Sequence, residues 1–510
     1  MQRRQFFQGA LAAGAFTAAA SATVGRHALA ALPEPVLQHS AATAAPWVPP
    51  GVTGAGLPYR PVVTLNGWTL PFRMRDGVKE FHLVAEPVLR EVAPGFVVNM
   101  WGYNGQSPGP TIEVVEGDRV RIFVSNRLPE PTSIHWHGQR LPSGMDGVAG
   151  INQPSIGAGK TFVYEFQARR PGTFMYHPHA DEMVQLAMGM MGMWVTHPKL
   201  DARGRHPLIE AVQRDYCFLL NAFDVEPGAQ TPTVATMFDF NTWAWNSRVF
   251  PGIDPLVARL GDRVRMRMGN LTMINHPIHV HGVEFEVTGT DGGPVPRSAR
   301  WPEVTVDLAV GQMRQIEFLA DEPGDWAVHC HKSHHTMGPM GHDVPTMIGV
   351  DHRGLVGKIQ GLAPDFMVMG ERGMYDMKQM PMELPPNTLP MMAGHGQFGP
   401  IGMGGMLTVL KVRANQAPDD YRDPGPYAFP SGSVAFEYRG PVPEAVRPPS
   451  PPQAAHGEVR RGAQGGHGGG AHGAHGAAPP PSPATPATPA TPATPATPAT
   501  PAPAAPVHRH

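Results

Sequence analysis

Short stretches of alternating apolar and polar residues recur through the middle of the chain. In residues 120–124 and again in residues 264–268, every second position is apolar. Side chains two apart on a strand point to the same face, so each stretch predicts a half-buried strand. Gly, Pro and Asn bound these stretches and favour turns. The pattern predicts an all-β fold built from short strands, as in a β-sandwich or barrel.

The strand pattern belongs to a larger internal repeat. The sequence Gly-Asp-Arg-Val-Arg at 117–121 recurs at 261–265, an offset of 144 residues, and a His-x-His-Gly motif follows each copy at that same offset. A second block, containing Glu-Phe, Pro-Gly and two more histidines, matches at an offset of 152 residues. The small difference between the offsets corresponds to one loop insertion. The repeat therefore predicts two tandem domains, which we place at 60–200 and 208–412.

Composition narrows the class of protein. The 40 Lys and Arg nearly balance the 42 Asp and Glu, which gives no electrostatic reason to expect a nucleic-acid partner. No stretch reaches the roughly 20 apolar residues that a membrane span requires. The two cysteines, Cys217 and Cys330, are too few for a disulfide framework, and the apolar neighbours of Cys217 are typical of a core residue. The 25 His and 28 Met are unusual, and both residue types bind metals.

The two ends of the chain differ from its middle. In residues 1–30, Arg3 and Arg4 precede an Ala- and Gly-rich apolar run that ends in Ala-Leu-Ala. This resembles a twin-arginine export signal cleaved near Ala30, and it predicts a periplasmic or secreted protein rather than a membrane-anchored one. Residues 443–510 are rich in Gly and His and then repeat Pro-Ala-Thr, which predicts a disordered tail.

Four His-x-His pairs carry the strongest chemical signal. On a strand, both histidines of such a pair face the same side, so they can converge on one metal site or on two adjacent metals. A single pair would be an ordinary core or surface feature, whereas four pairs in the register of the repeat predict a metal centre. Eight neutral imidazoles suit copper, iron or zinc better than hard cations. The pairs are His135/His137, His177/His179, His279/His281 and His329/His331.

A cysteine breaks the symmetry between the two copies. Pro178 separates the histidines of one pair, and Cys330 takes the corresponding place in the second copy. A strand turns Cys330 to the face opposite its flanking histidines, where His276 and His335 are available. Two histidines, one thiolate and a distant methionine, here Met340, form the ligand set of an electron-transferring blue copper site.

Together these motifs resemble those of multicopper oxidases, the family of laccases and copper-tolerance oxidases. The motifs His-Trp-His-Gly, His-Pro-His, His-Pro-Ile-His-Val-His-Gly and His-Cys-His-x-x-x-His occur in this order, and the resemblance covers roughly residues 95–412. It implies two cupredoxin-like β-sandwich domains and four copper ions. The implied ligands are His276, Cys330, His335 and axial Met340 for type 1 copper; His135 and His279 for type 2; and His137, His177, His179, His281, His329 and His331 for the type 3 pair.

The resemblance also implies a reaction. Phenolic or aromatic donors would lose one electron at a time at type 1 copper, and dioxygen would be reduced by four electrons to water at the trinuclear cluster. Asp146 lies at the spacing where the family keeps a carboxylate near this cluster, so it is the candidate proton relay, although an Asp before Gly is also common in turns. Thr336 replaces a second carboxylate that many members carry, which leaves Glu182 as a candidate by position only.

The chain departs from most of the family in the number of residues between its second and third motifs. Only 97 residues separate His179 from His276, which leaves no room for a middle domain. Two-domain members assemble as rings of three chains, in which each trinuclear cluster lies between the first domain of one chain and the second domain of the next. The resemblance therefore implies a homotrimer.

A second departure is an insertion at 343–403, directly after the type 1 motif. It makes Met403 and Met406 competitors of Met340 for the axial position. Thirteen methionines lie between residues 337 and 406. They are either adaptable core residues or thioethers that collect Cu(I), in which case the protein would be a cuprous oxidase for periplasmic copper tolerance.

Two other classes fit the motifs less well. A two-domain nitrite reductase would carry the blue-copper cysteine in its first domain and would lack the full set of type 3 ligands. A non-enzymatic copper store would bind copper without taking up oxygen.

Overall fold

The fold is described from a computed structural model. The structure describes residues 59–235, 240–338, 347–366, 368, 370–372, 384–391 and 394–446. One compact unit extends to residue 435, and residues 436–446, the described part of a second unit, form neither helix nor strand. The predicted export signal, Met340 and most of the predicted tail lie outside the described residues. The domain boundaries given above also stay predictions.

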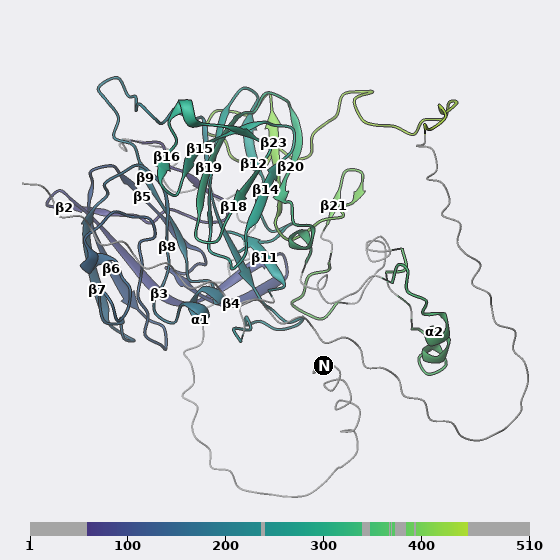
Figure 1. Cartoon of the computed structure of the whole chain (residues 1–510), viewed down its shortest axis with the longest axis horizontal. Coiled ribbons are helices and arrows are strands. Elements are labelled where there is room, and N and C mark those ends of the chain that lie inside the picture. Colours follow the sequence, from purple (N-terminus) through teal and green to yellow (C-terminus); the bar gives the residue numbers. More distant parts are fainter. Residues whose placement is uncertain are drawn as a thin grey trace, which may run out of the picture. The chain divides into compact units, whose positions relative to one another are not determined.

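In the first half of the unit, the described strands form two facing sheets (Figure 1). One has the order β2-β3-β6-β7, with β4 paired to β3, and the other has the order β5-β9-β8. The strands are β2 (Arg73–Arg75), β3 (Val78–Ala93), β4 (Phe96–Tyr103), β5 (Gly109–Val115), β6 (Arg119–Asn126), β7 (Thr161–Gln167), β8 (Gly172–Tyr176) and β9 (Gly192–His197).

The second half repeats this arrangement. One sheet has the order β1-β10-β13-β19-β15-β16, with β11 on β10 and β17 on β15, and the other has the order β12-β23-β20-β14-β18. The strands are β1 (Val63–Thr64), β10 (Arg214–Phe223), β11 (Thr242–Trp245), β12 (Leu256–Arg259), β13 (Arg263–Asn270), β14 (His276–Val280), β15 (Phe285–Thr290), β16 (Gly293–Pro294), β17 (Pro302–Glu303), β18 (Thr305–Leu308), β19 (Met313–Leu319), β20 (Gly324–Cys330) and β23 (Leu407–Arg413).

The strand pairings confirm the duplication that the sequence predicts. β3 runs parallel to β6, and β10 runs parallel to β13. β6 pairs antiparallel with β7, as β13 does with β19. On the facing sheets, β5 is parallel to β9 and β12 is parallel to β23. The prediction of an all-β fold with two tandem β-sandwiches is therefore confirmed.

Helices are short and lie between strands. No helix in the described part of the chain has the length and apolar character needed to cross a membrane. The remaining elements are α1 (Glu182–Ala187), α2 (Arg353–Gln360), the 3₁₀ turns η1 (Ser143–Met145), η2 (Arg297–Ala299) and η3 (Ser333–Thr336), and the small hairpin of β21 (His395–Gly396) and β22 (Gly399–Pro400).

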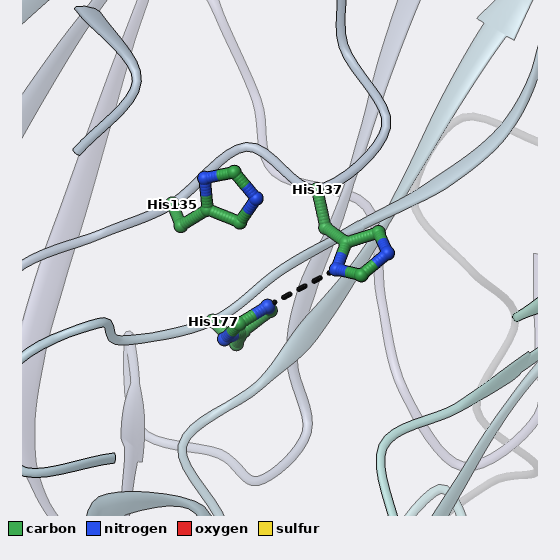
Figure 2. Close-up of side chains that lie close together, drawn as sticks. All are labelled: His135, His137 and His177. Carbon is green, nitrogen blue, oxygen red and sulfur yellow. Dashed lines mark hydrogen bonds between the residues drawn. The ribbon is translucent and has the colours of Figure 1, made fainter. Parts of the chain in front are cut away.

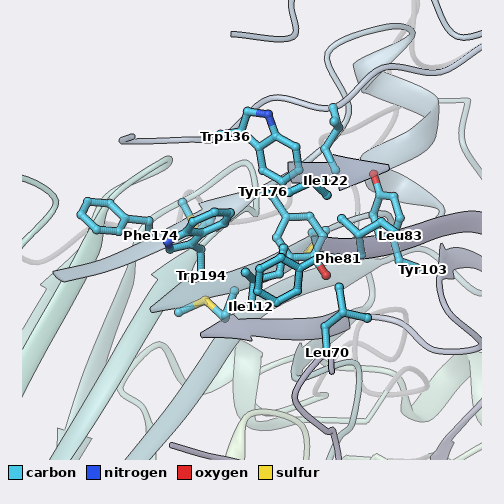
Figure 3. Packing of buried hydrophobic residues seen from close by; sticks show 14 of the residues in the cluster. Leu70, Phe81, Leu83, Tyr103, Ile112, Ile122, Trp136, Phe174, Tyr176 and Trp194 are labelled. Atoms are coloured by element: carbon cyan, nitrogen blue, oxygen red, sulfur yellow. The ribbon is translucent and has the colours of Figure 1, made fainter. Parts of the chain in front are cut away.

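The core of the first sandwich holds aromatic side chains from both sheets (Figure 3). Trp136 is fully buried among them and meets Tyr164 and Trp194 edge to face, with ring centroids 5.4 and 5.7 Å apart. Such aromatic pairs add to the stabilisation from burial. Because Trp136 separates His135 from His137, its packing fixes the backbone between these two histidines.

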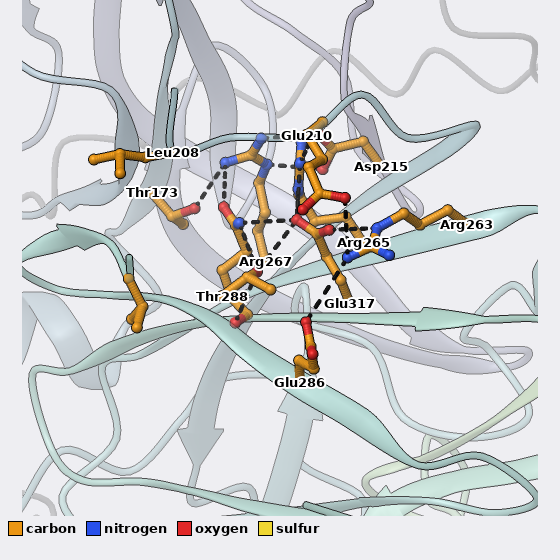
Figure 4. A network of polar contacts seen from close by, with 12 residues as sticks. Thr173, Leu208, Glu210, Asp215, Arg263, Arg265, Arg267, Glu286, Thr288 and Glu317 are labelled. Carbon is orange, nitrogen blue, oxygen red and sulfur yellow. Dashed lines mark hydrogen bonds and ion pairs between the residues drawn. The ribbon is translucent and has the colours of Figure 1, made fainter. Parts of the chain in front are cut away.

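The alternation expected for β13 is only partly observed. β6 alternates buried and partly exposed side chains, but β13 is buried at nearly every position because its arginines lie in an ion-pair network (Figure 4). Arg267 binds both carboxylate oxygens of Asp215 at 2.7 and 2.8 Å, and it also donates to Thr173 of β8. Arg265 donates to Asp215 and Glu317. Since β8 belongs to the first sandwich, this network joins the two sandwiches.

Candidate metal centre

The four His-x-His pairs share one local design. In each pair, the intervening residue is buried while the histidines flank it: Trp136, Pro178, Val280 and Cys330 occupy these positions. Alternation along extended backbone explains this, because neighbouring side chains point to opposite faces. The second-copy histidines lie in or directly after β14 and β20, whereas in the first copy an isolated bridge between His135 and His177 replaces the expected strand pairing.

In the first sandwich, His135, His137 and His177 bring ring nitrogens within 4.8 Å of one another (Figure 2). Nδ1 of His137 lies 3.2 Å from Nε2 of His177. The ring centroid of His179 lies 5.6 Å from that of His135 and 6.0 Å from that of His177. All four histidines predicted for this copy therefore form one group, which we call cluster 1.

The second sandwich holds an equivalent group, cluster 2, formed by His279, His281, His329 and His331. Nε2 of His281 lies 3.1 Å from Nε2 of His329, the counterpart of the His137–His177 contact. The ring centroids of His279 and His329 are 5.7 Å apart, and those of His329 and His331 are 5.6 Å apart. His281 and His331 are exposed. In the described residues, ring contacts join histidines within each cluster and not across the two.

Backbone carbonyls fix several of these imidazoles in one tautomer. Nδ1–H of His135 donates to the carbonyl of Asp146 at 2.8 Å, and Nδ1–H of His279 donates to that of Val304 at 2.6 Å. His177 and His329 likewise donate to the carbonyl of the residue that follows each, at 2.9 Å. A neutral imidazole that donates from Nδ1 offers Nε2 as a metal ligand. The sequence did not predict the carbonyl partners of His135 and His279, because these contacts join residues 11 and 25 positions apart.

Burial favours the neutral form of four of the cluster histidines. It lowers the pKa of His177 to about 3, and together with neighbouring histidines it also lowers the pKa of His137, His281 and His329. Metal ligation requires the unprotonated nitrogen, so these four imidazoles are in the form that binds metal at neutral pH.

A third group, formed by His276, Cys330 and His335, is completely buried. Sγ of Cys330 lies 3.6 Å from Nδ1 of His276 and 3.3 Å from Nδ1 of His335, and these two nitrogens are 3.1 Å apart. These separations are short enough for all three atoms to bind one ion, since metal–nitrogen bonds are about 2.0–2.1 Å long and metal–sulfur bonds about 2.3 Å. The donor set of two imidazoles and one thiolate fits copper.

The environment of this group also suits a metal. Burial, aided by Lys332 and His334, lowers the pKa of His276 to about 3, and burial raises the pKa of the Cys330 thiol to about 11. Binding of a cation would therefore displace the thiol proton. Thr272, which sequence reasoning missed, places its hydroxyl 2.7 Å from Nε2 of His276 and so directs Nδ1 towards the sulfur.

The candidate carboxylates and methionines lie near these groups. A carboxylate oxygen of Asp146 lies 3.5 Å from Nδ1 of His135, and those of Glu182 lie 3.5 and 3.7 Å from Nδ1 of His177 and His179. Met406 is buried in the second core and binds Cys330 and His335 through its backbone, while Met403 is partly exposed. Both sulfur assignments, like that of Met340, stay predictions.

Comparison with known proteins finds two segments of the chain that match one family. Sequence models described as multicopper oxidase match residues 90–201 and 226–349. A probable nitrite reductase-hydroxylamine oxidoreductase fusion protein of Kuenenia stuttgartiensis is 28% identical over 280 residues, covering 52% of this chain and 31% of the relative. Copper resistance protein A of Escherichia coli is 40% identical over 118 residues, covering 23% of this chain and 18% of the relative.

A solved structure is also similar, the blue copper oxidase of Nitrosomonas europaea, with a TM-score of 0.48 and 25% identity over 65% of this chain and 85% of that one. The chain spans about a third or less of the length of the two curated relatives named above. The two matched segments contain both histidine clusters and the His276–Cys330–His335 group, and these two segments are multicopper oxidase domains.

Proposed function

We propose that the protein is a copper oxidase that takes single electrons from a reducing substrate and passes four of them to dioxygen, forming water. In this proposal His276, Cys330 and His335 hold type 1 copper, with Met340 as axial ligand, and clusters 1 and 2 hold the type 2 ion and the type 3 pair. When bound, the four copper ions would supply the redox chemistry. The chain would fix their geometry, exclude water and deliver protons.

One observation carries the proposal. Cys330 points its sulfur at His276 and His335, while the ring of its neighbour His329 faces His281 in cluster 2. A single peptide segment thus connects an electron-entry site to an oxygen-reducing site. A nitrite reductase or a copper store has no need for this connection together with the eight imidazoles of clusters 1 and 2.

The two clusters support the proposed homotrimer. His281 and His331 of cluster 2 are exposed, so this half of the site is open to a partner. Cluster 1 meets a different part of its own chain, because His137 lies against Gly311, with 3.5 Å between its Cε1 and the position of a Cβ at that glycine. In a ring of three chains, cluster 1 of one chain would meet cluster 2 of the next.

Proton delivery is assigned to Asp146. Its carboxylate lies beside Nδ1 of His135, and its backbone carbonyl holds the same ring, so the acid group stays at the edge of cluster 1. Export through the twin-arginine route to the periplasm or the exterior is part of the same proposal and rests on residues 1–30.

The donor has two candidates. Phenolic and aromatic compounds are the first, on the basis of the resemblance to laccases. Cu(I) is the second, with a role in copper tolerance, and the relatives named copper resistance protein A and the methionines of 337–406 favour it.

The experiment is oxygen consumption by copper-loaded protein with 2,6-dimethoxyphenol, with Cu(I) and with nitrite as an alternative acceptor. Four copper ions per chain, absorbance near 600 nm and oxygen uptake with either donor are expected. Fewer than four ions, a colourless protein, or nitrite reduction without oxygen uptake would contradict the proposal.

A further inference from the structure

Trp243 covers the candidate type 1 site from the side of β11. Its ring is stacked on that of His335, with centroids 4.5 Å apart and planes only 15° from parallel. Trp243 lies on β11, which pairs antiparallel with β10 and contacts η3, the turn that carries His335. Trp243 is itself buried, with 5% of the residue exposed.

His334 also belongs to this cover. Its ring meets those of Trp243 and His335 edge to face, with ring centroids 5.6 and 4.3 Å apart. The side chain of His334 is exposed. By contrast, His276, Cys330 and His335 are all 0% exposed. Among the described residues, solvent therefore reaches His334 and a small part of Trp243, but it does not reach His276, Cys330 or His335.

We infer that Trp243 determines which donors the oxidase accepts, by holding them one ring away from His335; the inference rests on the proposed function. A donor would lose one electron, which would cross the Trp243 and His335 rings to type 1 Cu(II) and reduce it to Cu(I), with no bond made or broken in either ring. A phenol would in addition release a proton to water. Small inorganic one-electron donors, including Cu(I), need no cleft for this transfer, whereas phenols that must pack against the ligand histidine are disfavoured.

The same ring has a second consequence that can be measured without turnover. An apolar layer that excludes water from a copper ligand favours the less charged Cu(I) state and raises the reduction potential. Removal of the indole would let water reach His335 and would lower the midpoint potential. Trp243 thus acts as a positioning and specificity residue rather than a ligand.

The test uses copper-loaded, full-length Trp243→Ala and Trp243→Phe. Trp245→Ala is the matched control, because Trp245 lies on the same strand, is 2% exposed and packs on Phe218 instead of His335. Two quantities are measured anaerobically: the midpoint potential from the absorbance near 600 nm, and the rates at which ferrocyanide and 2,6-dimethoxyphenol bleach that absorbance.

For Trp243→Ala we expect a lower midpoint potential and a roughly tenfold rise in the ratio of the phenol rate to the ferrocyanide rate, in the range of effects that residues around metal ligands produce. Trp243→Phe keeps a flat ring, so its midpoint potential and its rate ratio should stay close to those of the parent protein. If Trp243→Ala loses its blue absorbance, Trp243→Leu takes its place in the comparison.

Equal potentials and equal rate ratios in the Trp243 and Trp245 variants would overturn the inference. Failure of the proposed function is a separate outcome, since the parent protein itself would then lack blue absorbance or oxygen uptake.

Discussion

His329 and Cys330 are adjacent at the end of β20, yet their side chains serve different groups on opposite faces of the strand. Nε2 of His329 lies 3.1 Å from His281 in cluster 2, and Sγ of Cys330 lies 3.3 Å from Nδ1 of His335. Register fixes this division, because Cys330 lies opposite Ile278 and His329 lies opposite His279 of β14. A shift of one residue would exchange the two faces and separate all of these groups.

Thr272 provides the first test of the type 1 assignment. Its hydroxyl accepts the Nε2–H of His276, so Thr272→Val should leave a buried N–H unpaired and let the ring rotate away from Cys330. We expect copper affinity at this site to fall about 10- to 100-fold, as is usual when a partner of a metal ligand is removed. Titration of metal-free protein with Cu(II), followed near 600 nm, measures this.

Thr272→Ser is the matched control, because it keeps the hydroxyl and should bind copper like the parent protein. Similar affinities for the Val and Ser variants would argue against His276 as a type 1 ligand.

Much of this site could be predicted from sequence because its signals are local. The His-x-His spacing and the position of Cys330 between two histidines depend only on the alternation of side chains along extended backbone. The duplication added a second, independent copy of the same evidence. The structure brings together the histidines of each cluster, and it also brings together His276, Cys330 and His335; their roles as ligands stay predictions.

The residues that were missed make contacts distant in sequence. Trp243 lies 92 residues before His335, and nothing in the Thr-Trp-Ala-Trp stretch distinguishes a ring that covers a metal site from a ring in the core. The arginines of β13 were missed for a similar reason. They occupy alternate positions that the strand pattern assigns to solvent, but Arg265 and Arg267 are buried in ion pairs with Asp215, a residue about 50 positions away.

Asp146 offers a test of proton delivery. Asp146→Asn keeps the backbone carbonyl that holds His135 but removes the acid group, so the histidine cluster should stay in place while protonation slows. We expect steady-state oxygen consumption to fall about 100-fold or more, the usual contribution of a general acid, with blue absorbance unchanged. Glu165→Gln, an exposed carboxylate on β7, is the control. Unchanged oxygen consumption in the Asn variant would remove Asp146 from the mechanism.

The buried ion pairs predict an acid-dependent stability. Burial alone would raise the pKa of Asp215, but Arg267 and Arg265 hold it below its ordinary value. Its ionised form therefore stabilises the fold above the ordinary pKa of about 4, and this contribution is lost as the pH falls through the lowered pKa.

Asp215→Asn should reduce the free energy of unfolding at pH 7 by about 3–5 kcal/mol, because two buried arginines lose a charged partner. The difference from the parent protein should narrow as the pH falls below about 4. Urea unfolding at several pH values measures both effects, with exposed Asp201→Asn as the control. A difference that is constant with pH would mean that the charge of Asp215 is not responsible.

The proposed ring of three chains makes a prediction that a single-chain site does not. His137→Ala disables cluster 1 and His281→Ala disables cluster 2, and each variant alone should consume no oxygen. Suppose that each oxygen-reducing site combines cluster 1 of one chain with cluster 2 of the next. A trimer that contains both variants then has one intact site, at the place where the unmutated cluster 1 of one chain meets the unmutated cluster 2 of its neighbour. Random reassembly of an equal mixture should restore about a quarter of the parent activity.

The control is a mixture of His137→Ala with His177→Ala, two variants that both disable cluster 1. No trimer formed from this mixture contains an unmutated cluster 1, so the mixture should consume no oxygen. Reassembly is followed by oxygen consumption and by mass in solution, so that an inactive mixture can be distinguished from chains that failed to associate. Trimers of mixed composition without oxygen consumption would show that both clusters of a working site come from the same chain, and the proposed assembly would then be wrong.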